Sequence, residues 1–312
     1  MSPSGSASET RSRPTLLYDP LMRGIWLILF AAVLWGTTGT AQELGPEAAS
    51  PLAVGSLRLL LGTVVLVLLA VFNRPDAGWR WLVRPATLFA AAGVAAFQLF
   101  FFSGVDRTGV AVGTLLALGS AAVFVGVIEV LLTATWPNPK WVAATVPAII
   151  GLAILATATR ESDVDGTGVI LALAAGLSYA TYIVCAARLA RLGSVRHSTA
   201  AIFSLASVML APVALTQDLS FVRSIDGAVM VLWLGLVTLA VAYLLFTSGL
   251  RSTDSSTAAT LSLAEPVTAT VLGVVVLAER PSLGAWFGIG LIVLGLVLAA
   301  RSSRADVPLV PG

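Results

Sequence analysis

The sequence predicts an all-α polytopic membrane protein, with ten transmembrane helices arranged as two inverted five-helix repeats. The chain has 312 residues, of which 57% are hydrophobic and 11% are charged, whereas a soluble domain carries about 25% charged residues. Its apolar stretches run for about twenty residues without interruption, which is the length that an α-helix needs to cross a bilayer. A membrane β-barrel would instead show alternating segments of about ten residues.

The two halves of the chain are similar to each other. The segment TGVAVGTLLALGSAAVFVGV begins at Thr108 and corresponds to TDSSTAATLSLAEPVTATVL, which begins at Thr253. Each copy then reaches a tryptophan, Trp141 or Trp286, at the same offset of 145 residues. Because each repeat holds an odd number of spans, the second repeat must lie upside down in the membrane, as in many secondary transporters.

The apolar runs define the elements in order. The expected spans cover residues 24–42, 50–72, 82–105, 109–132, 141–158, 167–187, 199–216, 227–249, 254–278 and 284–300. A segment rich in Ser, Pro and Arg precedes them, and such a composition favours disorder. The expected organisation is a disordered cytoplasmic tail, a first repeat, a second repeat and a second cytoplasmic tail, at residues 1–22, 23–159, 160–301 and 302–312.

The basic residues predict the orientation. With the N-terminus in the cytoplasm, thirteen of the 18 lysines and arginines fall on the cytoplasmic side, as the positive-inside rule requires. The acidic loop at 160–168 then falls outside. We therefore expect both termini in the cytoplasm. The many Ala, Gly and Arg residues, beside a single lysine, indicate a GC-rich bacterial genome.

The inventory of reactive residues excludes several kinds of chemistry. The chain has one histidine, His197, one cysteine, Cys185, and one lysine, Lys140. It can therefore build no disulfide, cysteine-based zinc site or Walker phosphate loop of its own, and we expect no metal and no cofactor. A membrane-embedded enzyme would need clustered His, Asp or Lys, and a channel would need a filter or charged ring. The net charge of +2 is scattered between the spans and predicts no nucleic-acid binding.

Glu265 and Pro266 are the sharpest candidate site residues. They lie near the middle of the ninth span, where a charged carboxylate costs about 3 kcal/mol on insertion and is usually functional. Pro266 cannot donate a helix hydrogen bond, so it should kink the span and free a carbonyl near Ser262. The repeat partner of Glu265 is Ser120, so the acid belongs to one half only. The alternative is a buried acid that merely holds the bundle together.

The first span carries a second group of candidates. Trp35, Thr38 and Gln42 offer an aromatic ring and polar atoms that could contact a substrate, and Gly36 and Gly39 are candidate hinge positions. Small residues and threonines are also common in ordinary contacts between membrane helices, so helix packing is the alternative interpretation.

Other polar and aromatic groups lie deep in the remaining spans. They are Gln98, Ser178, Tyr179, Tyr182 and Tyr243. The internal repeat pairs Trp35 of the first span with Ser178 of the sixth. A wall of aromatic rings with a few hydroxyls and amides suits an amphipathic organic molecule better than a bare ion, although each residue alone could serve packing.

Arg58 lies near the outer end of the second span, and Glu43 lies at the outer end of the first. An ion pair between them would lower the cost of placing both charges in the membrane. We expect such an ion pair, which could also serve as an outer gate.

The whole arrangement resembles the EamA family of the drug/metabolite transporter superfamily. The resemblance rests on the Trp-Gly pair in the first span and on the closing segment LAEPVTATVLGVVVLAERPSLGAWFGIGLIVLGLVLA, and it covers about residues 23–301. The first half departs from the pattern at TATWPNPKW, where the family's turn carries a glutamate. The resemblance implies a ten-span inner-membrane carrier with a central cavity between its repeats.

Members of that family transport amino acids, sugars, nucleotide sugars, drugs and other metabolites, and the aromatic residues make this chain similar to the YddG-type exporters of aromatic amino acids. We therefore expect an exporter of small amphipathic metabolites, amino acids foremost, that works by alternating access as a monomer or weak homodimer in the lipid bilayer. A drug carrier, another metabolite carrier and an uncoupled facilitator stay open as alternatives, and so does coupling to protons.

Overall fold

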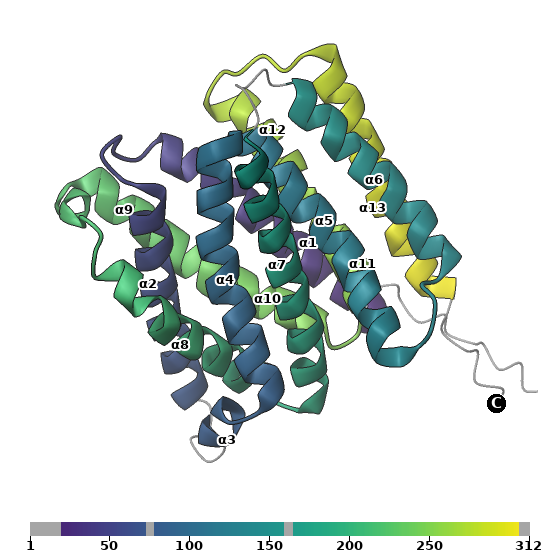
Figure 1. Cartoon of the computed structure of the whole chain (residues 1–312), viewed down its shortest axis with the longest axis horizontal. Helices are drawn as coiled ribbons and strands as arrows, with labels where there is room; N and C mark the ends of the chain where they lie inside the picture. The colour runs from purple at the N-terminus through teal and green to yellow at the C-terminus, as the bar shows by residue number, and fades with distance from the viewer. Residues whose placement is uncertain (1–19, 73–77, 159–164, 306–312) are drawn as a thin grey trace, which may run out of the picture.

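The computed structural model describes residues 20–72, 78–158 and 165–305, and this part of the chain contains ten helices long and apolar enough to cross a membrane. The predicted ten-span, all-helical fold is confirmed (Figure 1). The spans of the first half are α1 (Pro20–Glu43), α2 (Pro51–Val71), α4 (Pro85–Thr108), α5 (Val110–Thr133) and α6 (Pro139–Ala158). A short helix, α3 (Gly78–Leu82), precedes α4.

The second half contributes three continuous spans and two composite ones. The continuous spans are α7 (Gly166–Leu192), α8 (Val195–Ala214) and α13 (Leu283–Ala305). The eighth span joins α9 (Ile225–Trp233), η3 (Leu234–Val241) and α10 (Ala242–Gly249). The ninth joins α11 (Ser255–Leu261) and α12 (Ala264–Val276), and a 3-10 turn, η2 (Ser220–Arg223), precedes α9.

The first and last described helices extend into the ranges that we expected to be tails. α1 begins at Pro20, and α13 continues to Ala305, so residues 20–22 and 302–305 are helical. The rest of both tails, 1–19 and 306–312, lies outside the described residues. Because ten spans are an even number, both ends of the described chain lie on one side of the bundle. We call this side the terminal end, and the other the opposite end.

Polar residues at the helix starts show why the spans begin where they do. Ser50 precedes Pro51, and its side chain accepts a hydrogen bond from the Ala53 amide at 3.2 Å. Serine at the N-cap followed by proline at the first helical position satisfies the free amides of a helix start. Ser224 and Asp254 cap α9 and α11 in the same way.

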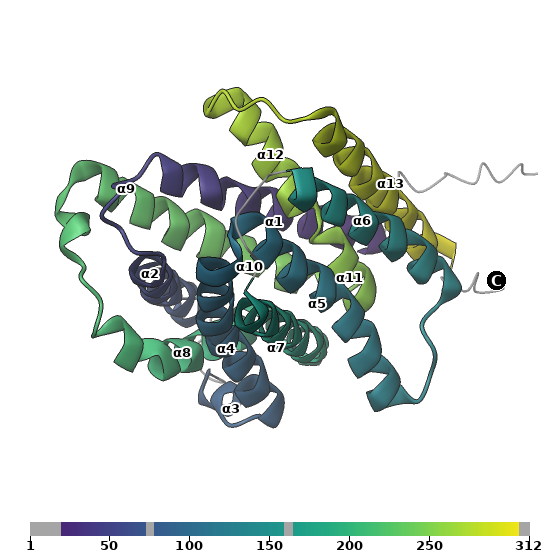
Figure 2. The same cartoon turned by 45° about the horizontal axis from the view of Figure 1, so that its top comes forward.

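The helices meet in pairs that repeat between the two halves. α4 and α5 of the first half both pack against α7, the first span of the second half. In the same way, α10 and α12 of the second half both pack against α1, the first span of the first half. α6 and α13, the fifth span of each half, form a pair at the margin of the bundle (Figure 2). This exchange of partners is what two related five-span repeats predict.

Two glycines fix the register of the repeats. A Cβ added to Gly24 of α1 would lie 2.6 Å from Thr253 Oγ1, and a Cβ added to Gly168 of α7 would lie 2.6 Å from Thr108 Cγ2. Thr108 and Thr253 begin the corresponding segments of the two repeats. Because Gly168 contacts Thr108 and Gly24 contacts Thr253, the two glycines are equivalent positions, at an offset of 144 residues. The pairing of Trp35 with Ser178 was wrong by one residue, since this register pairs Trp35 with Tyr179. The error arose because small residues dominate both helices and leave the alignment without an anchor.

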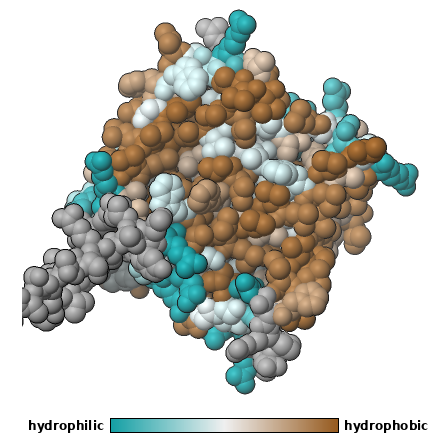
Figure 3. Space-filling model, turned by 180° about the vertical axis from the view of Figure 1, so that it is seen from behind, coloured by the Kyte–Doolittle hydropathy of each residue, from teal (hydrophilic) through white to brown (hydrophobic). Residues whose placement is uncertain are grey.

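The face of the bundle seen in Figure 3 is largely apolar, and its hydrophilic residues lie mainly at its margins. Large hydrophobic side chains of the spans, such as Phe30, Phe89, Ile170 and Val208, are exposed. In water such a surface would aggregate, whereas in a bilayer it contacts lipid chains. The surface thus agrees with the multi-pass membrane location that the span lengths predict.

Candidate substrate site

The ninth span is broken near its middle. α11 ends at Leu261 and α12 begins at Ala264, with Ser262 and Leu263 between them. At the break, the Glu265 amide donates to the Ser262 carbonyl at 3.0 Å, three residues back rather than four. Pro266 then occupies the first turn of α12, where the missing N–H of proline costs no helix hydrogen bond. The local sequence thereby places Glu265 at the start of a new helix inside the bundle.

The eighth span has an irregularity that the sequence does not signal. Its middle third, Leu234–Val241, is a π-helix, a form that is rare and often found at functional sites. The run contains neither proline nor any polar residue besides Thr238, so nothing in its composition predicts the wider turn. Leu239 and Tyr243 project from this region into the centre of the bundle.

Seven aromatic side chains from five spans meet at the centre, and we call them the aromatic cluster. Its members are Trp35, Phe97, Tyr179, Tyr182, Phe203, Tyr243 and Phe246. The ring centroid of Tyr243 lies 4.6 Å from that of Phe203 and 4.9 Å from that of Trp35. These separations lie within the range that stabilises tilted and edge-to-face ring pairs.

A small cavity of about 10 Å³ lies among these rings. Its lining consists of Arg58, Leu59, Val94, Phe97, Gln98, Tyr179, Tyr182, Phe203, Leu239 and Tyr243. A volume of about 10 to 15 Å³ holds one water molecule, so the centre is closed and no organic substrate fits. Gln98 is held in place because its Nε2 donates to the Gly55 carbonyl at 3.4 Å. Tyr182 has Thr247 Oγ1 within 3.4 Å of its hydroxyl.

Arg58 belongs to this centre and makes no ion pair with Glu43. It lines the cavity together with Tyr243, whereas Glu43 is exposed at the end of α1. The expected pair was wrong because the sequence gives the depth of Arg58 but not the direction in which its helix turns. Arg58 Nε and Trp35 Nε1 are both buried without a hydrogen-bond partner, which costs free energy unless a ligand supplies one.

Glu265 lies beside the cluster, at the contact between α12 and α1. A Cβ added to Gly36 would lie 2.8 Å from the Glu265 carbonyl oxygen, so the two backbones approach closely there. Gly36 adjoins Trp35, whose ring lies 4.9 Å from that of Tyr243, so Glu265 lies next to the aromatic cluster. Ser262, in the break, is buried and faces Tyr179. The structure thus brings the acid, the break and the cluster together.

Several other predicted site residues lie away from the cavity. Gln42 Nε2 donates to the Thr38 carbonyl at 3.4 Å, within the last turns of α1. Ser120 Oγ donates to a carbonyl of its own helix and lies against Gly176 of α7. Gly39 has no neighbouring atom within 4 Å of an added Cβ. Gln42 and Ser120 thus bond within their own helices, and Gly39 lies at no close helix contact.

Ser178 is also engaged locally. Its Oγ donates to the Ala174 carbonyl at 2.7 Å, one turn earlier in α7. The next residue, Tyr179, is the one that reaches the cavity. Sequence reasoning missed Phe203, Phe246 and Leu239, since an apolar residue in an apolar span carries no signal of the direction in which it points.

A second and larger cavity, of about 500 Å³, lies at the terminal end between α5, α6, α7 and α11. Charged and hydroxyl side chains line it, among them Glu129, Arg188, Arg191, Asp254, Ser255 and Ser256. α11 is buried along its whole length. Trp141 Nε1 donates to Thr260 Oγ1 at 3.1 Å and thereby ties α6 to α11. This polar cavity, which we call the terminal cavity, was not expected from the sequence.

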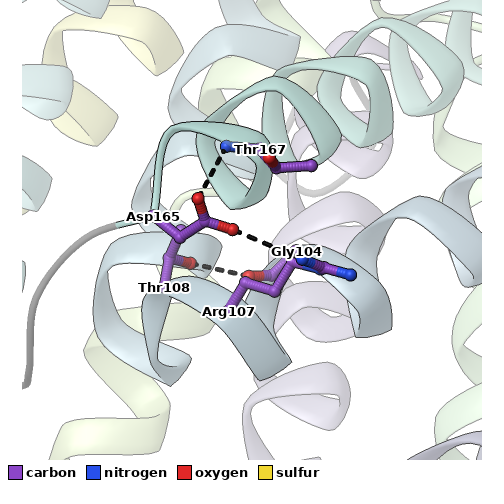
Figure 4. Close-up of polar contacts among 5 residues, drawn as sticks. All are labelled: Gly104, Arg107, Thr108, Asp165 and Thr167. Carbon is purple, nitrogen blue, oxygen red and sulfur yellow. Dashed lines mark hydrogen bonds and ion pairs between the residues drawn. The ribbon is translucent and has the colours of Figure 1, made fainter.

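At the opposite end, Asp165 joins the two halves (Figure 4). Its Oδ1 accepts a hydrogen bond from the Thr167 amide at 3.2 Å, and its Oδ2 lies 3.4 Å from Arg107 Nη1. The backbone N–H of Thr167 and the neighbouring guanidinium lower the pKa of the Asp165 carboxyl below its ordinary value. Nearby, Thr108 Oγ1 donates to the Gly104 carbonyl at 2.9 Å. Asp165 therefore caps α7 and anchors it to the end of α4.

Comparison with known proteins agrees with this architecture. The chain matches the EamA-like transporter family twice, over residues 22–157 and 166–301, once for each set of five spans. This chain belongs to the EamA-like transporter family. A solved crystal structure superimposes with a TM-score of 0.77 over 90% of this chain and 98% of that one, at 21% sequence identity. That likeness shows a shared fold.

Similar EamA-like proteins are named as transporters. An uncharacterized transporter of Bacillus subtilis, YwfM, is 38% identical over 279 residues, which cover 89% of this chain and 93% of the relative. The threonine/homoserine exporter RhtA of Escherichia coli K12 is 29% identical over 282 residues, or 88% of each chain. An uncharacterized inner membrane transporter of Salmonella typhimurium, YicL, is 23% identical over 90% of this chain and 96% of its own. The chain is therefore a membrane transporter of the EamA type.

Proposed function

We propose that this EamA-like protein exports small amphipathic metabolites, amino acids foremost, across a bacterial inner membrane by alternating access. The observation that carries the proposal is the aromatic cluster with Arg58, Gln98 and Glu265 beside it, at the junction of the two repeats. Aromatic walls with a few convergent polar groups suit organic molecules of this kind. RhtA, named as an exporter of two amino acids, and the inner-membrane relative YicL support the substrate class and the location.

In this proposal the centre alternates between closed and open forms. Trp35, Tyr179, Tyr182 and Tyr243 would contact the substrate once their rings separate, and Gln98 would offer its amide. A cavity of about 10 Å³ must expand before any amino acid enters, so the structure corresponds to a closed centre. Transporters commonly place such sites at broken helices near the midplane of the membrane.

The break before Pro266 is the candidate hinge. α11 is buried throughout, whereas Ala264, Pro266 and Gly273 are the buried residues of α12. The less buried half of the ninth span, α12, is therefore the half that would move. Gly36 permits the close approach of α1 and α12 at this point, and Glu265 would meet the amine of the substrate or accept a proton there.

The test is counterflow of a panel of labelled amino acids in proteoliposomes, with and without an imposed pH gradient. Counterflow of amino acids, aromatic members included, is the expected result, and a response to the gradient would assign a proton to the cycle. An indifferent response would favour facilitated diffusion. Folded protein that exchanges no amino acid at all would contradict the proposed substrate class.

A further inference from the structure

We propose that Arg58 binds the carboxylate of the substrate, so that the central site selects zwitterions held between Arg58 and Glu265. The inference deepens the proposed function and rests on it. Placing an arginine inside a membrane span costs free energy, so such a residue usually has a charged partner or a function. Among the described residues, no carboxylate lies within ion-pair distance of Arg58, so Arg58 lacks a carboxylate partner in the closed protein.

The position of Arg58 is the first argument. It contributes to the lining of the central cavity together with Phe97, Gln98 and Tyr179. Its Nε is fully buried and has no hydrogen-bond partner. A guanidinium that borders the central cavity and carries a buried donor without a partner can receive an acceptor from a ligand when the centre opens.

The charge on the other side is the second argument. Glu265, on α12, lies beside the aromatic cluster, because its backbone contacts Gly36, the neighbour of Trp35 in α1. Trp35 contacts Tyr243, which lines the cavity together with Arg58, and Arg58 and Glu265 form no ion pair with each other. The carboxylate of a zwitterion could bind Arg58 while its ammonium group binds Glu265. Such a ligand would bring no net charge into the membrane.

The chemistry of arginine gives the third argument. The planar guanidinium presents its donors in a fork that matches a carboxylate in two parallel hydrogen bonds, which lysine cannot reproduce. Glu265 can accept from a primary ammonium group. The side chain of the amino acid would then lie among the rings of the aromatic cluster, which tolerate both apolar and hydroxylated groups.

Competition in the counterflow assay tests the inference, with four probes: phenylalanine, threonine, phenylalaninamide and threoninamide. The amides keep the ammonium group and the side chain but lack the carboxylate. For the wild-type protein, we expect each amide to compete at least about tenfold more weakly than its parent amino acid, since a charge-assisted pair is lost. In Arg58→Gln the difference in competition between each amino acid and its amide should shrink to about twofold, because the group that binds the carboxylate has been removed.

Arg107→Gln is the matched control, since Arg107 is exposed at the end of α4, and it should keep the wild-type discrimination. Retention of that discrimination in folded Arg58→Gln would overturn the inference while leaving amino-acid transport intact. If Arg58→Gln does not fold, the competition measured with the wild-type protein still tests the inference. Equal competition there by each amino acid and its amide would overturn the inference. Absence of any amino-acid counterflow would instead contradict the proposed function itself.

Discussion

At the scale of single residues, the central charges set the chemistry of the site. Glu265 could be found from the sequence, because an acid beside a proline in the middle of an apolar span is conspicuous. The three tyrosines and Trp35 could also be found, and the structure places all of them in the aromatic cluster. Arg58 was assigned to the wrong neighbour, because helix rotation decides which way a side chain points and composition does not report it.

Replacing Glu265 with glutamine should abolish transport in a protein that still folds. The substitution keeps the shape and removes the charge that would bind an ammonium group or a proton. We expect a loss of about a hundredfold or more in counterflow, which corresponds to the lost charged hydrogen bond. Glu129→Gln is the matched control, since Glu129 is also a half-buried acid within a span but lines the terminal cavity. Full transport by Glu265→Gln at every pH would exclude a functional role for this carboxylate.

Asp165 gives a prediction on pH. Its pKa is lowered from the ordinary value of 3.8 in the folded protein, so its stabilising effect is present above that value and is lost as the pH falls through the lowered pKa. Asp165→Ala should therefore reduce the temperature of unfolding at pH 7, and the difference from wild type should narrow toward pH 3. Asp165→Asn keeps a capping acceptor and should lose less. A difference that stays constant with pH would contradict the capping role of the charge.

At the scale of elements, hydrophobic runs predict which segments cross the membrane but not how each one is built. The ten spans were predicted within a few residues at most ends. The break in the ninth span lies just before Pro266, where a proline signal exists. The π-helix of the eighth span has no such signal, since its sequence, LGLVTLAV, contains no proline.

The close contact between α4 and α7 predicts a large effect of one methyl group. A Cβ at Gly168 would lie 2.6 Å from Thr108 Cγ2 and 2.7 Å from Arg107 Cβ, so Gly168→Ala should destabilise the fold by about 1 to 3 kcal/mol through overpacking. Gly166→Ala is the control, because nothing lies within 4 Å of an added Cβ there. Thermal unfolding in detergent measures both. Equal stability of the two variants would contradict the helix contact.

At the scale of the whole molecule, two similar repeats form a site whose key residues differ between them. The repeat could be predicted from paired segments, and the family match divides the chain in the same way. Yet Glu265 corresponds to Ser120 and Pro266 to Ala121, so only one half carries the acid and the kink. In Figure 1 both halves share one bundle, with α6 and α13 beside each other at its margin. The closed centre and the terminal cavity could not be predicted, because they depend on how side chains from distant spans fill space.

The central claim is that substrate binds in the central cavity and not in the terminal cavity. Two matched single-cysteine variants in a Cys185→Ala background separate these sites: Val94→Cys in the central lining and Val130→Cys in the terminal lining. The measurement is the rate of labelling by a membrane-permeant maleimide, with and without a saturating transported amino acid. We predict that the amino acid slows labelling of Val94→Cys and leaves Val130→Cys unchanged. Protection of Val130→Cys alone would contradict the central site.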